Sequence, residues 1–254
     1  MTHVEISGRS LAVQTWGAGP AEIVLLHDGL GSIRQWRDVP AAIHLRTGRT
    51  VLAYDRSGHG TSTPAPTGPW PADWLHTEAD VLDALLDRLA IDAPVLVGHS
   101  DGGSIALLLA ATGRPMGGVV TFAAHTYVEQ VCVDFIREMR AASDRWIAGL
   151  SRTHPEAAPL FEAWSGVWTG AAFRSWDVRP SLAAIDCPTL VVQGIDDEYA
   201  TPEHAWSTAA AIGANASCVL LPEIGHLLNR EAPDRVVEIV ASFGRGLAVA
   251  GGRS

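Results

Sequence analysis

The sequence predicts an α/β fold in which a mostly parallel sheet is covered by helices on both faces. Short, almost wholly apolar runs alternate along the chain with helical patterns, as expected for parallel strands that are buried on both sides. The chain has 254 residues, 47% of them hydrophobic, which is enough for one such domain with a large core. Two opening segments, Val4–Ser7 and Leu11–Trp16, instead alternate in polarity around Ser7-Gly8-Arg9, which predicts an antiparallel hairpin.

Six apolar runs are the predicted parallel strands and, with the hairpin, make eight strands: Ile23–His27, Val51–Asp55, Pro94–Gly98, Gly118–Ala123, Thr189–Gly194 and Ser217–Leu221. The clearest helix is predicted over Thr77–Ala90, with Thr77 as its N-cap and a stripe of Val and Leu on one face. Another helix is predicted over about Pro233–Phe243, and a frayed tail from Gly244 onward.

Residues 126–180 interrupt the alternation, because they contain several helical patterns and no clear strand. We therefore predict three parts: a first core segment (1–125), an inserted helical cap or lid (126–180) over the carboxyl ends of the strands, and a second core segment (181–254). The alternative is that these helices cover a face of the sheet, although the crossover would then be overlong. The predicted lid is rich in aromatic residues: Phe135, Trp146, Phe161, Trp164, Trp168, Phe173 and Trp176.

The composition excludes several classes of partner. Twenty-eight acidic and eighteen basic residues give a formal net charge of −10, which disfavours nucleic acids and anionic membranes. No run approaches the roughly 18 apolar residues of a membrane span, and the first ten residues lack the pattern of a secretion signal. The three cysteines show no metal-ligand spacing. We expect a cytoplasmic protein that uses neither metal nor cofactor and acts on a small molecule.

The chain is organised around residues 95–104. A β-branched apolar run enters Gly98-x-Ser100-x-Gly102, and an apolar helical run follows it. This pattern is typical of a nucleophile on a sharp strand-to-helix turn, where flanking glycines make room for a strained backbone. Ser100 is the predicted nucleophile. The backbone N–H of Asp101, at the start of the helix, is a predicted donor to a developing oxyanion.

A serine hydroxyl needs a base to act as a nucleophile at neutral pH. His226 follows the last strand-like run, precedes the last helix and lies at the same sheet edge as Ser100, so it is the predicted base. The base needs a carboxylate to orient it. The turn after the preceding strand offers Asp196, Asp197 and Glu198, and the order serine, acid, histidine fits this architecture.

The second oxyanion donor is predicted in the glycine-rich loop His27-Asp-Gly-Leu-Gly-Ser32, whose backbone can approach a ligand closely. We assign it to the N–H of Gly29, with Leu30 as the alternative. Candidates for substrate contact are Leu30, His125 and the lid tryptophans Trp146, Trp164 and Trp168, although any one lid aromatic can instead belong to the core of the lid. The lid arginines are irregularly spaced and mark no dedicated clamp for an anion: Arg137, Arg140, Arg145, Arg152, Arg174 and Arg179.

Together these motifs resemble those of the serine α/β-hydrolase superfamily, in the branch with a helical cap that includes carboxylesterases, lactonases and C–C bond hydrolases. The matching segments extend over residues 23–226: His27-Asp-Gly-Leu-Gly-Ser32, Asp55-Arg-Ser-Gly-His-Gly60, Gly98-His-Ser-Asp-Gly-Gly103, Gly194-Ile-Asp-Asp197 and Gly225-His226. In this family the acid usually falls third after the strand-ending glycine, which here is Asp197. The chain departs from the family pattern at Asp28, where glycine is common, and at Asp101, where Met, Leu or Gln is common.

The resemblance implies an α/β-hydrolase fold and a cofactor-free hydrolase. We expect it to cleave an ester or lactone of a small to medium, largely apolar substrate through an acyl-enzyme on Ser100. A C–C bond hydrolase or a thioesterase with the same triad is the alternative within this chemistry. From other classes, the alternatives are a small-molecule receptor and a lyase that retain the triad.

Overall fold

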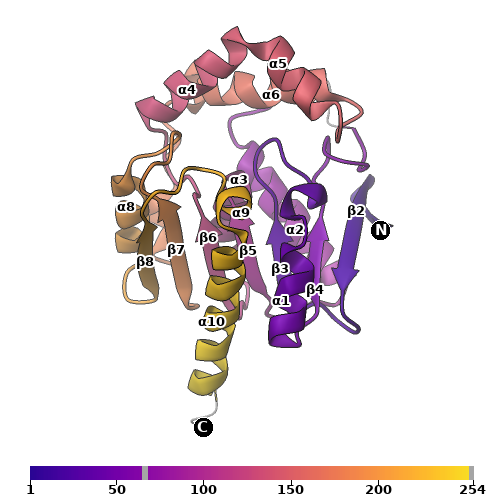
Figure 1. The fold of residues 1–254 in the computed structure, drawn as a ribbon, viewed down its shortest axis with the longest axis vertical. Helices are drawn as coiled ribbons and strands as arrows, with labels where there is room; N and C mark the ends of the chain where they lie inside the picture. The colour runs from indigo at the N-terminus through magenta and orange to yellow at the C-terminus, as the bar shows by residue number, and fades with distance from the viewer. Residues whose placement is uncertain (65–67, 252–254) are drawn as a thin grey trace.

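The computed structural model describes residues 1–64 and 68–251. Eight strands form one sheet in the order β1-β2-β4-β3-β5-β6-β7-β8 (Figure 1), with β1 and β2 antiparallel to their neighbours and the others parallel. The fold class is therefore confirmed, and each predicted strand end lies within two residues of the observed one. The strands are β1 (Thr2–Ile6), β2 (Arg9–Trp16), β3 (Ile23–Leu26), β4 (Val51–Tyr54), β5 (Val95–His99), β6 (Gly118–Phe122), β7 (Thr189–Gly194) and β8 (Ala216–Leu221).

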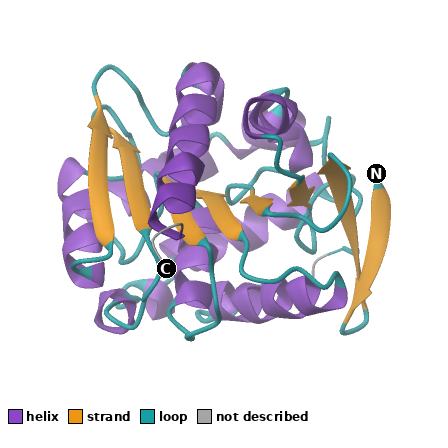
Figure 2. Cartoon of the chain, turned by 90° about the horizontal axis from the view of Figure 1, so that it is seen from below, coloured by secondary structure: helices purple, strands orange, loops and turns teal. Residues whose placement is uncertain are grey.

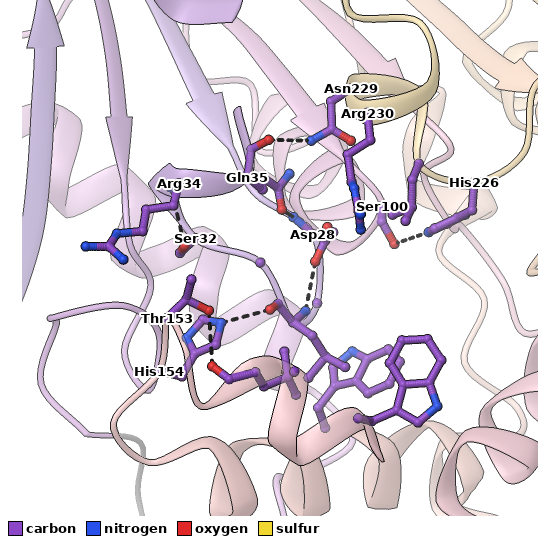
Figure 3. A pocket seen from close by; sticks show the side chains of 18 of the residues that line it. Asp28, Ser32, Arg34, Gln35, Ser100, Thr153, His154, His226, Asn229 and Arg230 are labelled. Atoms are coloured by element: carbon purple, nitrogen blue, oxygen red, sulfur yellow. Dashed lines mark hydrogen bonds between the residues drawn. The ribbon is translucent and has the colours of Figure 1, made fainter. Parts of the chain in front are cut away.

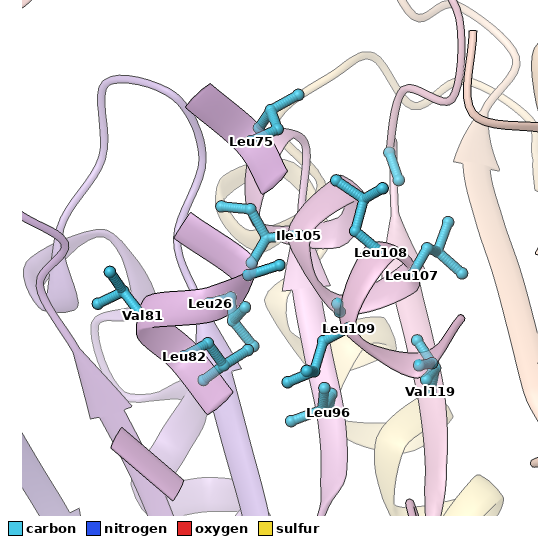
Figure 4. Close-up of a cluster of buried hydrophobic side chains, with 14 of the residues drawn as sticks. Leu26, Leu75, Val81, Leu82, Leu96, Ile105, Leu107, Leu108, Leu109 and Val119 are labelled. Atoms are coloured by element: carbon cyan, nitrogen blue, oxygen red, sulfur yellow. The ribbon is translucent and has the colours of Figure 1, made fainter. Parts of the chain in front are cut away.

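Helices cover both faces of the sheet (Figure 2). Alternate residues of the central strands point to opposite sides, so the apolar side chains of one strand pack against both helical layers. Leu26 of β3 and Leu96 of β5 belong to a cluster with α2 (Trp74–Arg88) and α3 (Asp101–Ala110) (Figure 4). Leu25 of β3 packs on the other side in a cluster with α1 (Val39–Thr47) and α10 (Pro233–Gly251). Burial on both faces is what makes these strands continuously apolar in the sequence.

Two predicted helix boundaries are wrong. Helix α2 begins at Trp74 rather than after Thr77, with Asp73 at its N-cap, because Trp74 and Leu75 are buried in the core and extend the helix toward the N-terminus. Helix α10 continues to Gly251, so the tail predicted from Gly244 is helical over 244–251. Arg49 donates a hydrogen bond to the Gly244 carbonyl oxygen at 3.3 Å, which ties this part of the helix to the core. Residues 252–254 of that prediction lie outside the described residues.

A helical insertion separates β6 from β7, and its helices α4, α5 and α6 lie across one end of the sheet (Figure 1). The two ends of the insertion meet in an isolated antiparallel bridge between Tyr127 and Asp177. Both observations support the division into core and cap, which stays a prediction. The insertion consists of α4 (Gln130–Ala141), α5 (Ser143–Leu150), α6 (Ala157–Thr169), η2 (Ala171–Phe173) and α7 (Arg179–Leu182).

The remaining elements connect the strands or follow the last one. They are η1 (Ile33–Trp36), which precedes α1, α8 (Pro202–Ile212), which joins β7 to β8, and α9 (Leu228–Glu231), which precedes α10. Within residues 1–64 and 68–251, no helix combines the length and the apolar composition that crossing a membrane requires.

Candidate active site

Ser100 stands on a sharp turn between β5 and α3, with a backbone φ of 52° and ψ of −122°, a region that L-residues rarely adopt. A Cβ on Gly98 would clash with the Gly102 backbone, and a Cβ on Gly102 would clash with the carbonyl of Leu26. Both glycines are therefore required by close backbone packing. The Ser100 N–H donates to the Phe122 carbonyl of the adjacent strand at 2.8 Å, which anchors the turn to the sheet.

The structure brings Ser100, His226 and Asp197 together in one hydrogen-bonded chain. The Ser100 Oγ lies 3.0 Å from His226 Nε2, and His226 Nδ1 lies 2.9 and 3.1 Å from the two carboxylate oxygens of Asp197. Because Nδ1 faces a carboxylate, it keeps the ring proton and leaves Nε2 free to accept the serine proton. The alternative acids lie elsewhere: Asp196 is exposed, and Glu198 accepts the backbone N–H of His226 at 3.1 Å.

The charge of Asp197 governs how His226 ionises. Burial of His226 lowers its pKa, but the nearby negative charge of Asp197 and their hydrogen bond more than offset this and raise the pKa above its usual 6.5. Burial likewise raises the pKa of Asp197, and the charge and hydrogen bond of His226 hold it below its usual value. The pair therefore favours the aspartate–imidazolium state that a histidine reaches after it removes a proton.

Contacts that the sequence did not predict fix the loop carrying His226. His99 Nε2 lies 2.8 Å from the carbonyl oxygen of His226, so the residue before Ser100 helps to position His226. Glu231 accepts the N–H groups of Gly225 and Leu227 at 2.8 and 3.1 Å. These bonds fix the backbone on both sides of His226 and thereby position its imidazole ring. Of these contacts, only that of Glu231 leaves a visible sign in the sequence, as an acidic residue five positions after His226.

The backbone N–H groups near Ser100 differ in whether they already have a hydrogen-bond acceptor in the protein. The N–H of Leu30 already donates to Asp28 Oδ1 at 2.9 Å. Among the described residues, neither the N–H of Gly29 nor that of Asp101 has a hydrogen-bond acceptor. Amides without a protein partner are available to an oxyanion. This geometry favours Gly29 over Leu30 as the second oxyanion donor. That the amides of Gly29 and Asp101 bind an oxyanion stays a prediction.

The loop after β3 is held in place by a buried arginine. Arg56 donates to the carbonyl oxygens of His27 and Asp28, each at 2.6 Å, and His59 Nε2 lies 3.0 Å from the carbonyl oxygen of Gly29. Three consecutive carbonyls thus have partners on the side of Arg56 and His59. The loop motif containing Arg56 and His59 was visible in the sequence, but the part that Arg56 plays was not.

A cavity of about 370 Å³ opens above Ser100 and His226, between the strand ends and the helical insertion (Figure 3). Among the predicted substrate contacts, it is lined by Leu30, Trp146 and Trp164. The structure does not bring His125 and Trp168 into this lining. They are 2% and 1% exposed, and their rings pack against each other at 5.1 Å behind the site. Counting the aromatic residues of the insertion cannot separate those that line the cavity from those that are buried away from it.

Trp164 joins the insertion to the turn that carries Ser100. Its indole N–H donates to Asp101 Oδ2 at 2.8 Å, which connects α6 to the first residue of α3. A Cβ on Gly29 would clash with both side chains, so glycine at this position makes room for the pair. Burial raises the pKa of Asp101 to about 6. The departure from the family pattern at Asp101 is therefore matched by a partner in the insertion.

Replacing Asp101 with asparagine is expected to stabilise the protein at pH 8 but not at pH 4. The folded pKa of about 6 exceeds the unfolded value near 3.9, so the folded state binds more protons in this window and loses stability as pH rises through it. The two-unit shift corresponds to about 2–3 kcal/mol above pH 6. Asparagine has no charge to bury and still accepts from Trp164.

Urea denaturation of both proteins at pH 4 and pH 8 measures this difference. The exposed Asp80 on α2 supplies the matched control, because Asp80→Asn should change stability little at either pH. An equal effect of Asp101→Asn at the two pH values would show that ionisation of this carboxyl is not involved.

The fold and the site together define an α/β hydrolase: a mostly parallel sheet that carries a serine on a strand-to-helix turn beside a histidine and an aspartate. Comparison with known proteins agrees, because the model of the alpha/beta hydrolase family matches residues 23–239. The chain belongs to this family, and the resemblance seen in the sequence is confirmed. In the part of the chain that the structure describes, no three His, Cys, Asp or Glu side chains are grouped so as to hold a metal ion.

Several relatives are similar over most of their length. The sn-1-specific diacylglycerol lipase ABHD11 of Mus musculus is 40% identical over 252 aligned residues, covering 87% of this chain and 80% of the lipase. The bifunctional esterase/perhydrolase DCH of Acinetobacter calcoaceticus is 23% identical, covering 86% and 90%. The crystal structure of the enol-lactonase from Burkholderia xenovorans LB400 superimposes with a TM-score of 0.76 at 25% identity, covering 95% and 98%. The named reactions differ, so the substrate must be argued from the cavity.

Proposed function

We propose that this protein is a serine hydrolase that cleaves an ester or lactone without a cofactor. The observation that carries the proposal is the hydrogen-bonded chain from Ser100 through His226 to Asp197 at the floor of the cavity. His226 takes the Ser100 proton as Oγ attacks the carbonyl carbon, and the amides of Gly29 and Asp101 stabilise the oxyanion.

The leaving alcohol oxygen then receives the proton from His226, and the carbonyl carbon stays on Ser100 as an acyl ester. In a lactone the alcohol remains attached to the acyl group. His226 next takes a proton from water, whose oxygen attacks the acyl carbon, and returns that proton to Ser100 as the acid leaves. The proton transfers run through His226, which lies 3.0 Å from Ser100 and 2.9 and 3.1 Å from the carboxylate oxygens of Asp197.

The cavity supports a substrate of small to medium size. Its volume of about 370 Å³ matches a compact ligand, and apolar side chains from the insertion form much of the wall beside Ser100. Met139, Trp146, Leu150 and Trp164 all line it. An apolar acyl group is therefore the part of the substrate that the insertion covers.

Labelling and trapping test this proposal. A fluorophosphonate should add to one site per chain, and peptide mass spectrometry should find it on Ser100. Rapid quenching with an activated ester should then reveal the mass of an acyl-enzyme before steady-state turnover. A chain that resists the label does not have an activated Ser100, and the proposal is wrong.

The same experiment separates the alternatives. A thioesterase or a C–C bond hydrolase would use the same three side chains and would be recognised by turnover of a thioester or a vinylogous diketone instead of esters and lactones. A receptor or a lyase would give no acyl-enzyme with any of these compounds. A labelled Ser100 without turnover would therefore favour the receptor or the lyase over the hydrolases.

A further inference from the structure

Four arginines gather at the cavity that contains Ser100. Arg34 lies in η1, Arg37 directly follows η1, Arg152 follows α5 in the insertion, and Arg230 lies in α9. We call these four residues the rim arginines. The chain carries a net charge of −10, and all 18 of its basic residues are arginine. The residues that line this cavity thus include four cations and two carboxylates, Asp28 and Glu198, which is an excess of positive charge in a chain that is acidic overall.

The rim arginines are not neutralised by the protein. Among the described residues, none of them forms an ion pair or donates a side-chain hydrogen bond, whereas seven other arginines pair with carboxylates. The two carboxylates in the cavity lining already have other partners. Asp28 accepts the Leu30 N–H and faces His99, and Glu198 accepts the His226 N–H. The charge of the rim arginines therefore remains available to a ligand.

Arg230 is a rim arginine whose side chain extends toward the reacting atoms. It lies four residues after His226, in the helix that follows the base. Figure 3 shows its side chain extending from α9 toward Asp28 and Ser100. Arg37 and Arg230 also line a second, more open hollow of about 360 Å³ with Leu227 and Glu231, so positive charge continues outward from the cavity.

We propose that the natural substrate carries an anionic group, a carboxylate or a phosphate, that binds Arg230 and the neighbouring rim arginines while the ester or lactone carbonyl lies at Ser100. A guanidinium binds such oxyanions through paired N–H donors. The acyl part lies against the apolar wall of the insertion, and the anion lies on the side of η1 and α9. The inference rests on the proposed function only for the position of the reacting carbonyl.

The sequence could not reveal this arrangement, and the proposal departs from the expectation of a largely apolar substrate without an anion clamp. Of the six arginines that the sequence places in the predicted lid, only Arg152 lines the cavity. The other three rim arginines come from loops and short helices of the core, 30 or more residues away from the lid in the sequence. Only the fold places them at one opening.

Matched aryl esters test the proposal. The set contains one ester that ends in a carboxylate, its phosphate analogue and its uncharged methyl-capped analogue. The wild type is expected to favour at least one anionic ester over the neutral one by about tenfold or more in kcat/KM, with the preference shrinking as salt is added. Comparison of the carboxylate and phosphate esters shows which anion is the better ligand.

Arg230→Gln should reduce the anionic-to-neutral ratio of kcat/KM by about tenfold. Adding Arg37→Gln to this variant should reduce the ratio further, because Arg37 lines the second hollow together with Arg230. Arg235→Gln is the matched control, because Arg235 lies on α10, pairs with Glu238 and does not line the cavity. It should leave the ratio unchanged. A ratio near one in the wild type, or an equal loss on all three esters in Arg230→Gln, would overturn the inference.

Binding separates this inference from the proposed function. Calorimetric titration of the Ser100→Ala variant with the same three esters needs no turnover, and an anionic ester should bind about tenfold more tightly than the neutral one. Anion preference in binding without ester cleavage by the wild type would sustain the rim-arginine site and reject the hydrolase. Cleavage of the neutral ester without anion preference in either assay would reject the site and sustain the hydrolase.

Discussion

Ser100→Ala is expected to lower the turnover of any accepted ester on the order of 10³-fold or more, with an unchanged fold. Ser100 Oγ is the hydroxyl bonded to His226 Nε2, at 3.0 Å, and the variant has no oxygen at that point to attack a carbonyl. Alanine bears the same backbone strain at φ 52° as serine, so the turn should persist. Steady-state kinetics and thermal unfolding measure the two effects.

Ser32 supplies a matched control within the same cavity. Its hydroxyl accepts the Arg34 N–H at 3.3 Å and lines the cavity, but it does not contact His226. Ser32→Ala should keep turnover within about tenfold of the wild type and should still take one fluorophosphonate label. If purified Ser100→Ala, free of contaminating esterase, retained activity within tenfold, the serine mechanism would be wrong.

The sheet was predictable because burial on both faces leaves a simple trace in the sequence. Leu25 and Leu26 are both fully buried, one against each helical layer, so the strand reads as a continuous apolar run. Helix ends were less predictable. The start of α2 depends on Trp74 packing into the core, which is a tertiary contact and not a local signal.

The candidate site also has residues that were predictable from local motifs and residues whose contacts depend on the fold. Ser100, Asp197 and His226 each follow a strand of a parallel sheet, so local motifs and chain order were enough to propose that they meet. Trp164 and Trp168 show the limit of that reasoning. They lie four residues apart on α6, yet Trp164 bonds to Asp101 at the cavity and Trp168 packs against His125 and Phe173, outside the cavity lining. Periodicity places both on one face of the helix, and only the fold shows what each contacts.

Asp197→Asn is expected to lower turnover by about 10³- to 10⁴-fold, whereas Asp196→Asn should leave it within about threefold. The carboxylate of Asp197 accepts the proton on His226 Nδ1, and an asparagine amide there would favour the other tautomer. Nε2 would then carry a proton and could not accept one from Ser100. Asp196 is the preceding residue, is exposed and has no such contact. The two variants therefore differ in the position of the substitution but not in its chemistry.

The pH dependence gives this comparison a second readout. Only neutral His226 can accept the serine proton, so activity should fall as pH drops through its pKa, which Asp197 raises above 6.5. Loss of the negative charge in Asp197→Asn lowers that pKa, and the acid limb of the residual activity should move to lower pH. In Asp196→Asn the limb should stay in place. If Asp196→Asn instead showed the larger loss and the shifted acid limb, the acid would be Asp196. A rate that does not change between pH 5 and 8, with chemistry rate-limiting, would contradict a histidine base.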